Sequence, residues 1–119
     1  MSRDIEFFRM LIGFRNYSPV KPNIHWIPPI DVYEFVDKFI IIAEVPGVEK
    51  EDIDITFKDG FLKISGYRKE MYNENRVKIH QMEINYGYFE KVIDVGNVSE
   101  KNIKADLKNG FLVITIKKS

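Results

Sequence analysis

The sequence predicts an all-β protein, an antiparallel β-sandwich that follows a short helical arm. After residue 29, apolar residues recur at every second position in short runs, which is the period of a half-buried strand. Turn-forming residue pairs separate these runs, and no helical pattern follows the arm. One strand–turn–strand pattern also occurs twice, as KDGFLKISG from Lys58 and as KNGFLVITI from Lys108. Short strands with regularly spaced turns are typical of a sandwich.

The arm is predicted from residues 1–18, where apolar side chains fall near one face of a helix and charged residues fill the rest. The prolines at 19, 22, 28 and 29 then break regular structure, because proline lacks the N–H and fixes φ. We therefore divide the chain into an arm with a stiff linker at 1–28 and a sandwich domain at 29–119. The apolar residues of the arm are Ile5, Phe7, Phe8, Leu11, Ile12 and Phe14.

The first two strands are expected at 30–35 and 39–45. Residues 30–35 alternate between two faces, with Ile30 and Val32 on one of them. The run FIIIAEV at 39–45 is almost continuously apolar, which predicts a strand covered on both faces. The Pro46-Gly47 pair ends this strand.

The next two strands form a hairpin. Residues 53–57 alternate apolar and polar side chains, and residues 61–64 are expected to return beside them. Asp59-Gly60 lies between and predicts a type I′ turn, because both central residues of that turn need positive φ.

The middle of the chain combines a loop with a strand. Residues 68–80 are polar and predict a long loop, with a short alternating piece at 76–79. MEINYGYFEKVIDV, residues 82–95, predicts one long strand, in which Gly87 marks a bulge or the close approach of another segment. Residues 98–102 predict a loop or a helical turn.

The second hairpin consists of strands expected at 103–107 and 111–118, joined by Asn109-Gly110. It repeats the first hairpin fifty positions later, and the apolar sites coincide between the two. The returning strands carry the heavier apolar load and are expected inside their sheets. The outer strands, 53–57 and 103–107, are apolar on one side only. Periodicity alone leaves open whether those apolar residues fill the core or line a surface slot.

Composition and motifs argue against several function classes. Lys and Arg number 18 and so do Asp and Glu, so nothing indicates a nucleic-acid or membrane partner. The sequence has no Cys, which excludes disulfides and thiolate chemistry and suits a reducing cytoplasm. Neither His25 nor His80 has a second ligand at metal-binding spacing, and no nucleophile or phosphate motif is present. We therefore expect neither enzyme activity nor a cofactor nor a metal, and no signal peptide.

Four stretches carry a resemblance to a known family. They are PPIDVYEFVDKFIIIAEVPGVEKEDIDI, GFLKISGYRKE, MEINYGYFEKVIDV and ADLKNGFL. In this order and spacing, from about Pro29 to Lys118, the chain resembles the α-crystallin domain of the small heat-shock proteins. The third stretch departs in part from the family pattern. Glu83, Gly87 and Phe89 match it, whereas Ile84 and Lys91 occupy its two Arg positions and Val95-Gly96 replaces Leu-Pro.

The resemblance implies an immunoglobulin-like sandwich that acts as an ATP-independent holdase for non-native client polypeptides. It also implies a cytoplasmic homo-oligomer built from strand-exchanged dimers. Within residues 68–80 the exchanged strand would involve Tyr72, Arg76, Val77, Lys78 and Ile79, unless this loop is only a solvated excursion. Lys91, at the second Arg position, is expected near the dimer interface, paired with a carboxylate.

The resemblance further implies a groove between the two outer strands that accepts an Ile-x-Ile tail from another subunit. At least one side chain in each wall should be solvent-accessible or covered by a neighbour's arm. Its residues would be Ile53, Ile55 and Phe57 in one wall and Ile103, Ala105 and Leu107 in the other. The family's tail beyond the final strand is not found in this sequence, so either this member lacks the tail or the chain was shortened. Ile114-Thr115-Ile116 fits its literal pattern, but it lies in the last expected strand and is interpreted as core.

Two further interpretations stay open beside the chaperone. A co-chaperone-type sandwich of the same fold would dock one specific partner, although such domains lack the long loop and the apolar arm seen here. A sugar- or ligand-binding sandwich would need polar and aromatic groups that converge on a cleft. The family's arm region contributes to assembly and client binding, so the arm predicted here favours the chaperone.

Overall fold

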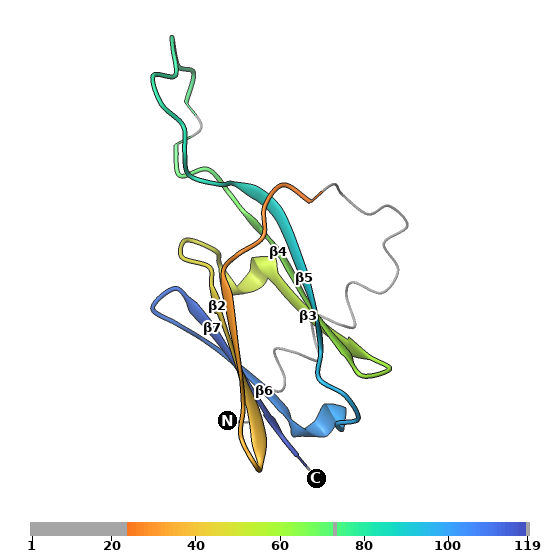
Figure 1. The fold of residues 1–119 in the computed structure, drawn as a ribbon. Coiled ribbons are helices and arrows are strands. Elements are labelled where there is room, and N and C mark those ends of the chain that lie inside the picture. Colours follow the sequence, from red (N-terminus) through yellow and green to blue (C-terminus); the bar gives the residue numbers. More distant parts are fainter. Residues whose placement is uncertain (1–23, 73, 119) are drawn as a thin grey trace.

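The fold is an antiparallel β-sandwich, seen in a computed structural model that describes residues 24–72 and 74–118 (Figure 1). Within these residues there is no α-helix, and the predicted arm at 1–18 lies outside them. Two short 3-10 turns, η1 (Lys50–Asp52) and η2 (Glu100–Asn102), each lead into an outer strand. The strands are β1 (Ile30–Glu34), β2 (Lys38–Glu44), β3 (Ile53–Lys58), β4 (Phe61–Arg68), β5 (Gly87–Asp94), β6 (Ile103–Lys108) and β7 (Phe111–Lys117).

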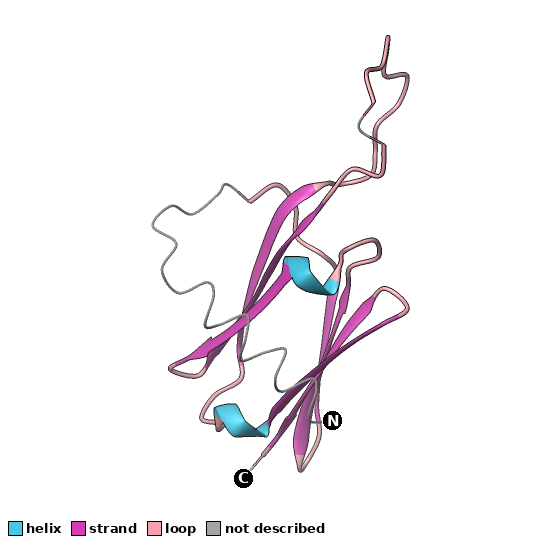
Figure 2. Ribbon diagram, turned by 180° about the vertical axis from the view of Figure 1, so that it is seen from behind, coloured by secondary structure: helices cyan, strands magenta, loops and turns pink. Residues whose placement is uncertain are grey.

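The strands form two sheets that face each other across the core (Figure 2). One sheet has the order β1-β2-β7-β6 and the other the order β3-β4-β5, with every neighbouring pair antiparallel. Side chains from both sheets meet between them and are fully buried, including Ile41, Ile55, Ile64, Phe89 and Ile114. The predicted sandwich is therefore confirmed.

The two echoing hairpins are β3–β4 and β6–β7. Their turns carry the positive φ angles that a type I′ turn requires: 52° and 85° at Asp59 and Gly60, and 52° and 83° at Asn109 and Gly110. The hairpins lie in different sheets, with β4 and β7 inside and β3 and β6 at the edges. This confirms that the returning strands, which carry more apolar residues, are internal. Ile114 and Ile116 are fully buried, so the literal Ile-x-Ile match is core.

Strand β2 differs from its prediction. Burial alternates along it, with Ile41 and Ala43 buried but Ile40 and Ile42 only partly buried. The expectation of a strand covered on both faces was wrong, because only one face of β2 packs into the sandwich. The other face belongs to the outer surface of the sheet, where the register partners Val113 and Thr115 are also partly exposed.

Strand β5 is shorter than predicted, because it begins at Gly87 instead of Met82. Gly87 has a φ of 100°, outside the extended region, and it pairs with the last residue of β4, so the sheet has no further partner there. The expectation that Gly87 marks a close approach is confirmed, since a side chain at this position would collide with the ring of His25.

The long loop between β4 and β5 projects away from the sandwich (Figure 1). It begins at Lys69, later than predicted, because β4 continues beyond Ile64 to Arg68. Its described residues contain no strand, including the alternating piece at 76–79. Several apolar side chains of the loop are exposed, among them Met71, Tyr72, Val77, Ile79, Met82 and Ile84.

Candidate functional site

The edge strands β3 and β6 place the six predicted groove residues in the structure. Each of these strands pairs with only one neighbour among the described residues, so each has an open backbone edge. The sequence brings them to matching places because each follows a 3-10 turn and precedes a two-residue turn. Both strands contribute apolar side chains to the same core cluster.

The side chains of the predicted groove divide into two groups. Ile53, Ile55 and Ile103 are fully buried and Ala105 is 1% exposed, so these four belong to the core. Phe57 and Leu107 are only partly buried and pack at the margin of the core. Each wall thus offers one partly exposed apolar side chain beside an open strand edge, and a ligand could contact these two side chains directly.

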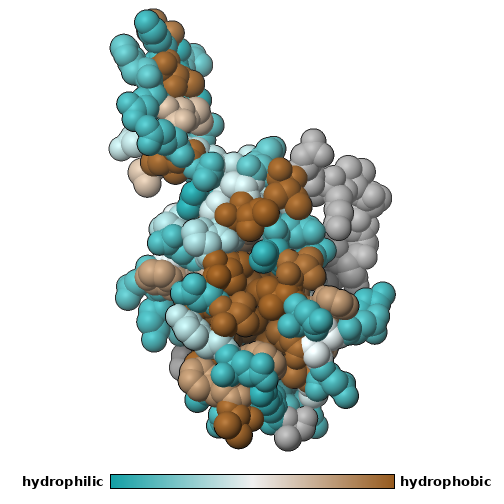
Figure 3. Space-filling view, viewed as in Figure 1, coloured by the Kyte–Doolittle hydropathy of each residue, from teal (hydrophilic) through white to brown (hydrophobic). Residues whose placement is uncertain are grey.

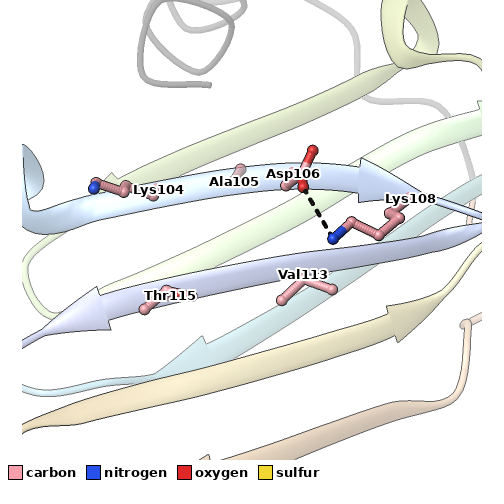
Figure 4. A pocket seen from close by; sticks show the side chains of 6 residues that line it. All are labelled: Lys104, Ala105, Asp106, Lys108, Val113 and Thr115. Atoms are coloured by element: carbon pink, nitrogen blue, oxygen red, sulfur yellow. Dashed lines mark ion pairs between the residues drawn. The ribbon is translucent and has the colours of Figure 1, made fainter. Parts of the chain in front are cut away.

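Open hollows lie at both strands. One, of ≈ 520 Å³, adjoins Phe57 between the Asp59-Gly60 turn and residues 94–98. The other, of ≈ 200 Å³, lies over β6 and β7, where Val113 and Thr115 form its floor (Figure 4). Charged side chains of β6 border it, and Lys108 pairs with Asp106 there at 4.0 Å. Both hollows have charged residues at their borders, and the one at Phe57 also offers the apolar side chains of Phe57, Phe61 and Val98.

Strand β1 provides another open edge, because it pairs only with β2. Val32 and Tyr33 are 47% and 48% exposed, although both lie in the middle of the strand. Apolar side chains gather in the middle of the face that is turned to the viewer (Figure 3). An exposed strand edge with apolar side chains is a surface that can accept another strand.

Lys91 lies on β5 and is exposed. It shares the inward side of this strand with Phe89 and Ile93, which are buried. β5 is the edge of its sheet, so Lys91 lies at an open strand edge. Its placement at a dimer interface stays a prediction.

The outer face of the three-stranded sheet carries a polar cluster. Asp54 and Ser65 are register partners and are 8% and 5% exposed, and Glu90 is the register partner of Ser65 on β5. The Tyr88 hydroxyl donates to Glu90 Oε1 at 3.0 Å. Burial raises the pKa of the Tyr88 phenol above its ordinary value, a hydrogen bond with Ser65 opposes the shift, and the charges of Glu90 and Asp54 add to it.

The base of the long loop holds contacts that sequence reasoning did not find. Arg68 reaches Trp26, Pro46 and Asn85, and Trp26 is buried in the core although we had assigned it to the linker. Asn85 and Pro46 lie 17 and 22 residues from Arg68 in the chain, Trp26 lies farther still, and no local pattern marks these contacts. The signal that the sequence offers is Trp26 itself, a large apolar side chain two residues before Pro28.

The remaining predicted site residues belong to the long loop and to the arm. The loop residues Tyr72, Val77 and Ile79 are exposed, as is Lys78, and Arg76 pairs with Glu70 at 3.1 Å. The apolar arm residues, from Ile5 to Phe14, lie outside the described part of the chain. The described residues include no cluster of potential metal ligands and no helix long and apolar enough to cross a membrane.

Comparison with known proteins gives consistent matches. The model of the Hsp20/alpha crystallin family matches residues 31–119. The chain is 32% identical over 114 residues to Small heat shock protein C2 of Rickettsia felis, covering 95% of this chain and 73% of that protein. It is 33% identical over 114 residues to Heat shock protein 16 of Schizosaccharomyces pombe, covering 88% and 78%.

Solved structures show the same likeness. Heat shock protein 16.0 from Schizosaccharomyces pombe matches with a TM-score of 0.72 at 30% identity, covering 78% of this chain and 87% of that one. A small heat-shock protein from Xylella fastidiosa matches with a TM-score of 0.71 at 28% identity, covering 79% and 87%.

Proposed function

The chain belongs to the Hsp20/alpha crystallin family, and from this membership we propose that it is an ATP-independent holdase chaperone. The observation that carries the proposal is the family match over residues 31–119. Members of this family are chaperones without enzymatic activity, so the prediction that the chain is not an enzyme is confirmed. The proposed activity is to bind partly unfolded polypeptides in the cytoplasm and to keep them from aggregating.

The direct test is to heat an aggregation-prone protein with and without this chain, in the absence of nucleotide. We expect light scattering by the client to fall as the chain is added in rising ratio. Unchanged scattering at a large excess of the chain would contradict the proposal. Binding to one folded partner instead would favour a co-chaperone-type docking module.

Client binding is proposed to reside in the arm. Replacing Phe7, Phe8 and Phe14 by Ser removes apolar groups worth about 1.5–3 kcal/mol each when buried. We expect protection of the client to fall while the far-UV circular dichroism of the sandwich is retained. The matched control replaces Phe35, Phe61 and Phe111, which are partly exposed on the sandwich itself. If the control loses protection and the arm variant does not, the clients bind the sandwich.

Assembly is proposed to proceed through a strand-exchanged dimer, in which the loop of one subunit pairs with β1 of the other. Two features support this: the projecting loop with exposed Val77 and Ile79, and the open edge of β1. Pairing would satisfy the backbone groups of that edge and cover apolar side chains of the loop. Homodimers of this kind would be the units of a larger homo-oligomer.

Deleting Tyr72–Lys78 should convert dimers to monomers, as measured by light scattering across a dilution series. A gentler variant replaces Val77 and Ile79 by Ser. Its control is Val36→Ser, because Val36 is 97% exposed on the turn between β1 and β2 and lies outside the loop. A dimer of unchanged affinity after the deletion would contradict strand exchange.

Lys91 is proposed to pair with a carboxylate of the partner subunit. Lys91→Arg should be tolerated, since the charge remains, whereas Lys91→Glu should weaken the dimer. Lys104→Glu makes the same charge change at an exposed position on β6 and serves as the control. Equal dimer affinities in the two Glu variants would show that Lys91 does not lie at the interface.

The groove between β3 and β6 is proposed to bind an Ile-x-Ile segment. Burial of two Ile side chains gives on the order of 3–6 kcal/mol, from which the cost of association is subtracted. A free peptide should therefore bind weakly, and many segments in one assembly should bind effectively. We expect the peptide to shift amide resonances in β3 and β6, and the double variant Phe57→Ser, Leu107→Ser to bind less. Shifts confined to other strands would contradict the groove.

A further inference from the structure

Arg68, the last residue of β4, joins the long loop to a neighbouring turn. Its Nε and Nη2 atoms donate to the carbonyl oxygen of Asn85 at 2.8 and 2.6 Å, and its Nη1 atom donates to the carbonyl oxygen of Pro46 at 3.0 Å. Asn85 lies at the end of the loop that begins directly after Arg68. The two ends of this loop are therefore fastened to each other by one guanidinium group.

The same guanidinium group also packs on the linker. Its central carbon lies 4.0 Å from the centroid of the Trp26 ring, close enough for a cation–π contact. Trp26 is only 7% exposed, its Nε1 donates to the carbonyl oxygen of Gly87 at 3.1 Å, and its ring centroid lies 5.1 Å from that of Phe89. Arg68 thus contacts the linker where the linker is anchored to β5.

His25 strengthens this anchor. Its backbone N–H donates to the carbonyl oxygen of Tyr88 at 2.8 Å, and its Nδ1 accepts from the backbone N–H of Tyr88 at 3.0 Å. Gly87 is needed for the contact, because a side chain there would collide with the His25 ring. The linker therefore follows the first residues of β5, immediately after the point where the loop ends.

The contacts of Arg68 depend on the shape of arginine as well as on its charge. These three hydrogen bonds go to backbone carbonyl groups, which require donors in fixed directions, and the flat face of the guanidinium group covers an indole ring. A lysine at this position would supply a point charge but neither the planar fork nor the stacking surface.

We propose that Arg68 is a positioning residue that couples the linker to the long loop, so that the two segments leave the sandwich in a fixed arrangement and loosen together. The coupling stands on the contacts of Trp26, Pro46 and Asn85 alone. Its importance for client protection rests on the proposed function, because the linker leads to the arm and the loop would supply the exchanged segment.

The test uses hydrogen exchange of the full-length chain, read by mass spectrometry, together with the fluorescence of Trp26, the only Trp in the sequence. In Arg68→Met we expect exchange at the hydrogen-bonded amides of 25–26 to become about tenfold faster and the Trp26 emission to shift to the red. At the loop end we expect faster chymotryptic cleavage after Tyr86, whose ring lies 5.9 Å from the Arg68 guanidinium. Arg76→Met is the control, because Arg76 lies on the same loop but contacts Glu70 and Tyr72. It should change neither segment.

The variant Trp26→Phe tests the coupling from the linker, because it changes the linker residue that Arg68 contacts. This variant should accelerate cleavage after Tyr86 in the native background and add little in the Arg68→Met background, because the contact between the two segments is already lost there. Arg68→Lys should restore less than half of the lost protection. If Arg68→Met does not fold, Trp26→Phe and Arg68→Lys carry the test.

Loosening of only one segment in Arg68→Met, or unchanged cleavage after Tyr86 in Trp26→Phe, would overturn the coupling. Client protection is measured separately on the same variants. If a variant that has lost the coupling still protects the client fully, the coupling is not needed for client protection, and the proposed holdase activity stands. A native chain that couples the segments but protects no client would contradict the proposed function alone.

Discussion

The two hairpins of the sandwich are nearly the same in sequence and in local structure but lie in different surroundings. Both enter through a 3-10 turn, both turn on a residue pair with positive φ, and both place an outer strand at a sheet edge. They differ in their outside neighbours, since β4 pairs with β5 whereas β7 pairs with β2. Local sequence thus determines the shape of each hairpin, and distant strands determine its sheet.

The outer faces of the hairpins show the clearest difference. Asp54 and Ser65 in the first hairpin are buried, while Lys104 at the position that matches Asp54 is exposed and Thr115 at the position that matches Ser65 is partly exposed. The first hairpin also borders Tyr88 and Glu90, and the second borders Ile40 and Ile42 instead. The inner faces of both hairpins therefore pack into one common core, whereas their outer faces differ in residue type and in burial.

The largest effect is expected when the shared inner face is damaged. Ile64→Ala and Ile114→Ala remove matching, fully buried side chains, and each should lower the free energy of unfolding by about 2–5 kcal/mol. Urea denaturation measures both. Phe61→Ala and Phe111→Ala are the controls, because these side chains begin the same strands and are partly exposed. A much smaller loss at one Ile would show that the hairpins are not equivalent in the core.

An intermediate effect is expected at the turns. Gly60→Ala and Gly110→Ala force an alanine into positive φ, which costs roughly 1–2 kcal/mol. The new Cβ would also lie 3.1 Å from Gly96 O in the first turn and 3.1 Å from Pro46 Cα in the second, so both variants should lose similar stability in thermal melts.

The turn prediction has its own control in Gly96→Ala. Gly96 has a φ of 72° but no atom within 4 Å of the added Cβ, so this variant measures backbone strain without a new contact. Equal losses at all three glycines would mean that the contacts add nothing. Unequal losses of stability at Gly60 and Gly110 would show that the two turns are not equivalent.

The smallest effect should appear at alkaline pH and only beside the first hairpin, at Tyr88 on the neighbouring strand β5. The raised pKa of Tyr88 means that its neutral form stabilises the fold below the pKa of the unfolded phenol, about 10, and that this contribution is lost as pH rises through the folded pKa. The stability difference between the native chain and Tyr88→Phe should therefore shrink above pH of about 10. Tyr67→Phe removes an exposed phenol from the register partner and supplies the baseline. A difference that does not change with pH would contradict burial of Tyr88.

Most of the fold could be predicted from the sequence because its signals are local. Alternation at 53–57 and 103–107, and the Asp59-Gly60 and Asn109-Gly110 turns, each act within a few residues. The errors arose where distant segments decide. The start of β5 at Gly87 depends on the end of β4 and on the linker, and the burial of Trp26 depends on Arg68 and Phe89.

The candidate groove shows the same limit. Periodicity identifies the apolar face of β3 and β6, but it cannot tell which of those residues are closed into the core. Ile53, Ile55, Ile103 and Ala105 are closed because the facing sheet covers them, whereas Phe57 and Leu107 lie at its margin. The margin of a sandwich follows from the relative placement of two sheets, which a single strand does not encode.

The place of β7 in its sheet has a consequence for biosynthesis. β7 is the last of the described strands in the chain, yet it lies between β2 and β6. While the ribosome is still making the segment before Phe111, β2 has only β1 beside it and β6 has no partner in this sheet. The nascent chain therefore exposes its apolar strands until β7 emerges, and the four-stranded sheet can close only in a late step. During that interval the newly made chain is itself an aggregation-prone polypeptide of the kind that a holdase would bind.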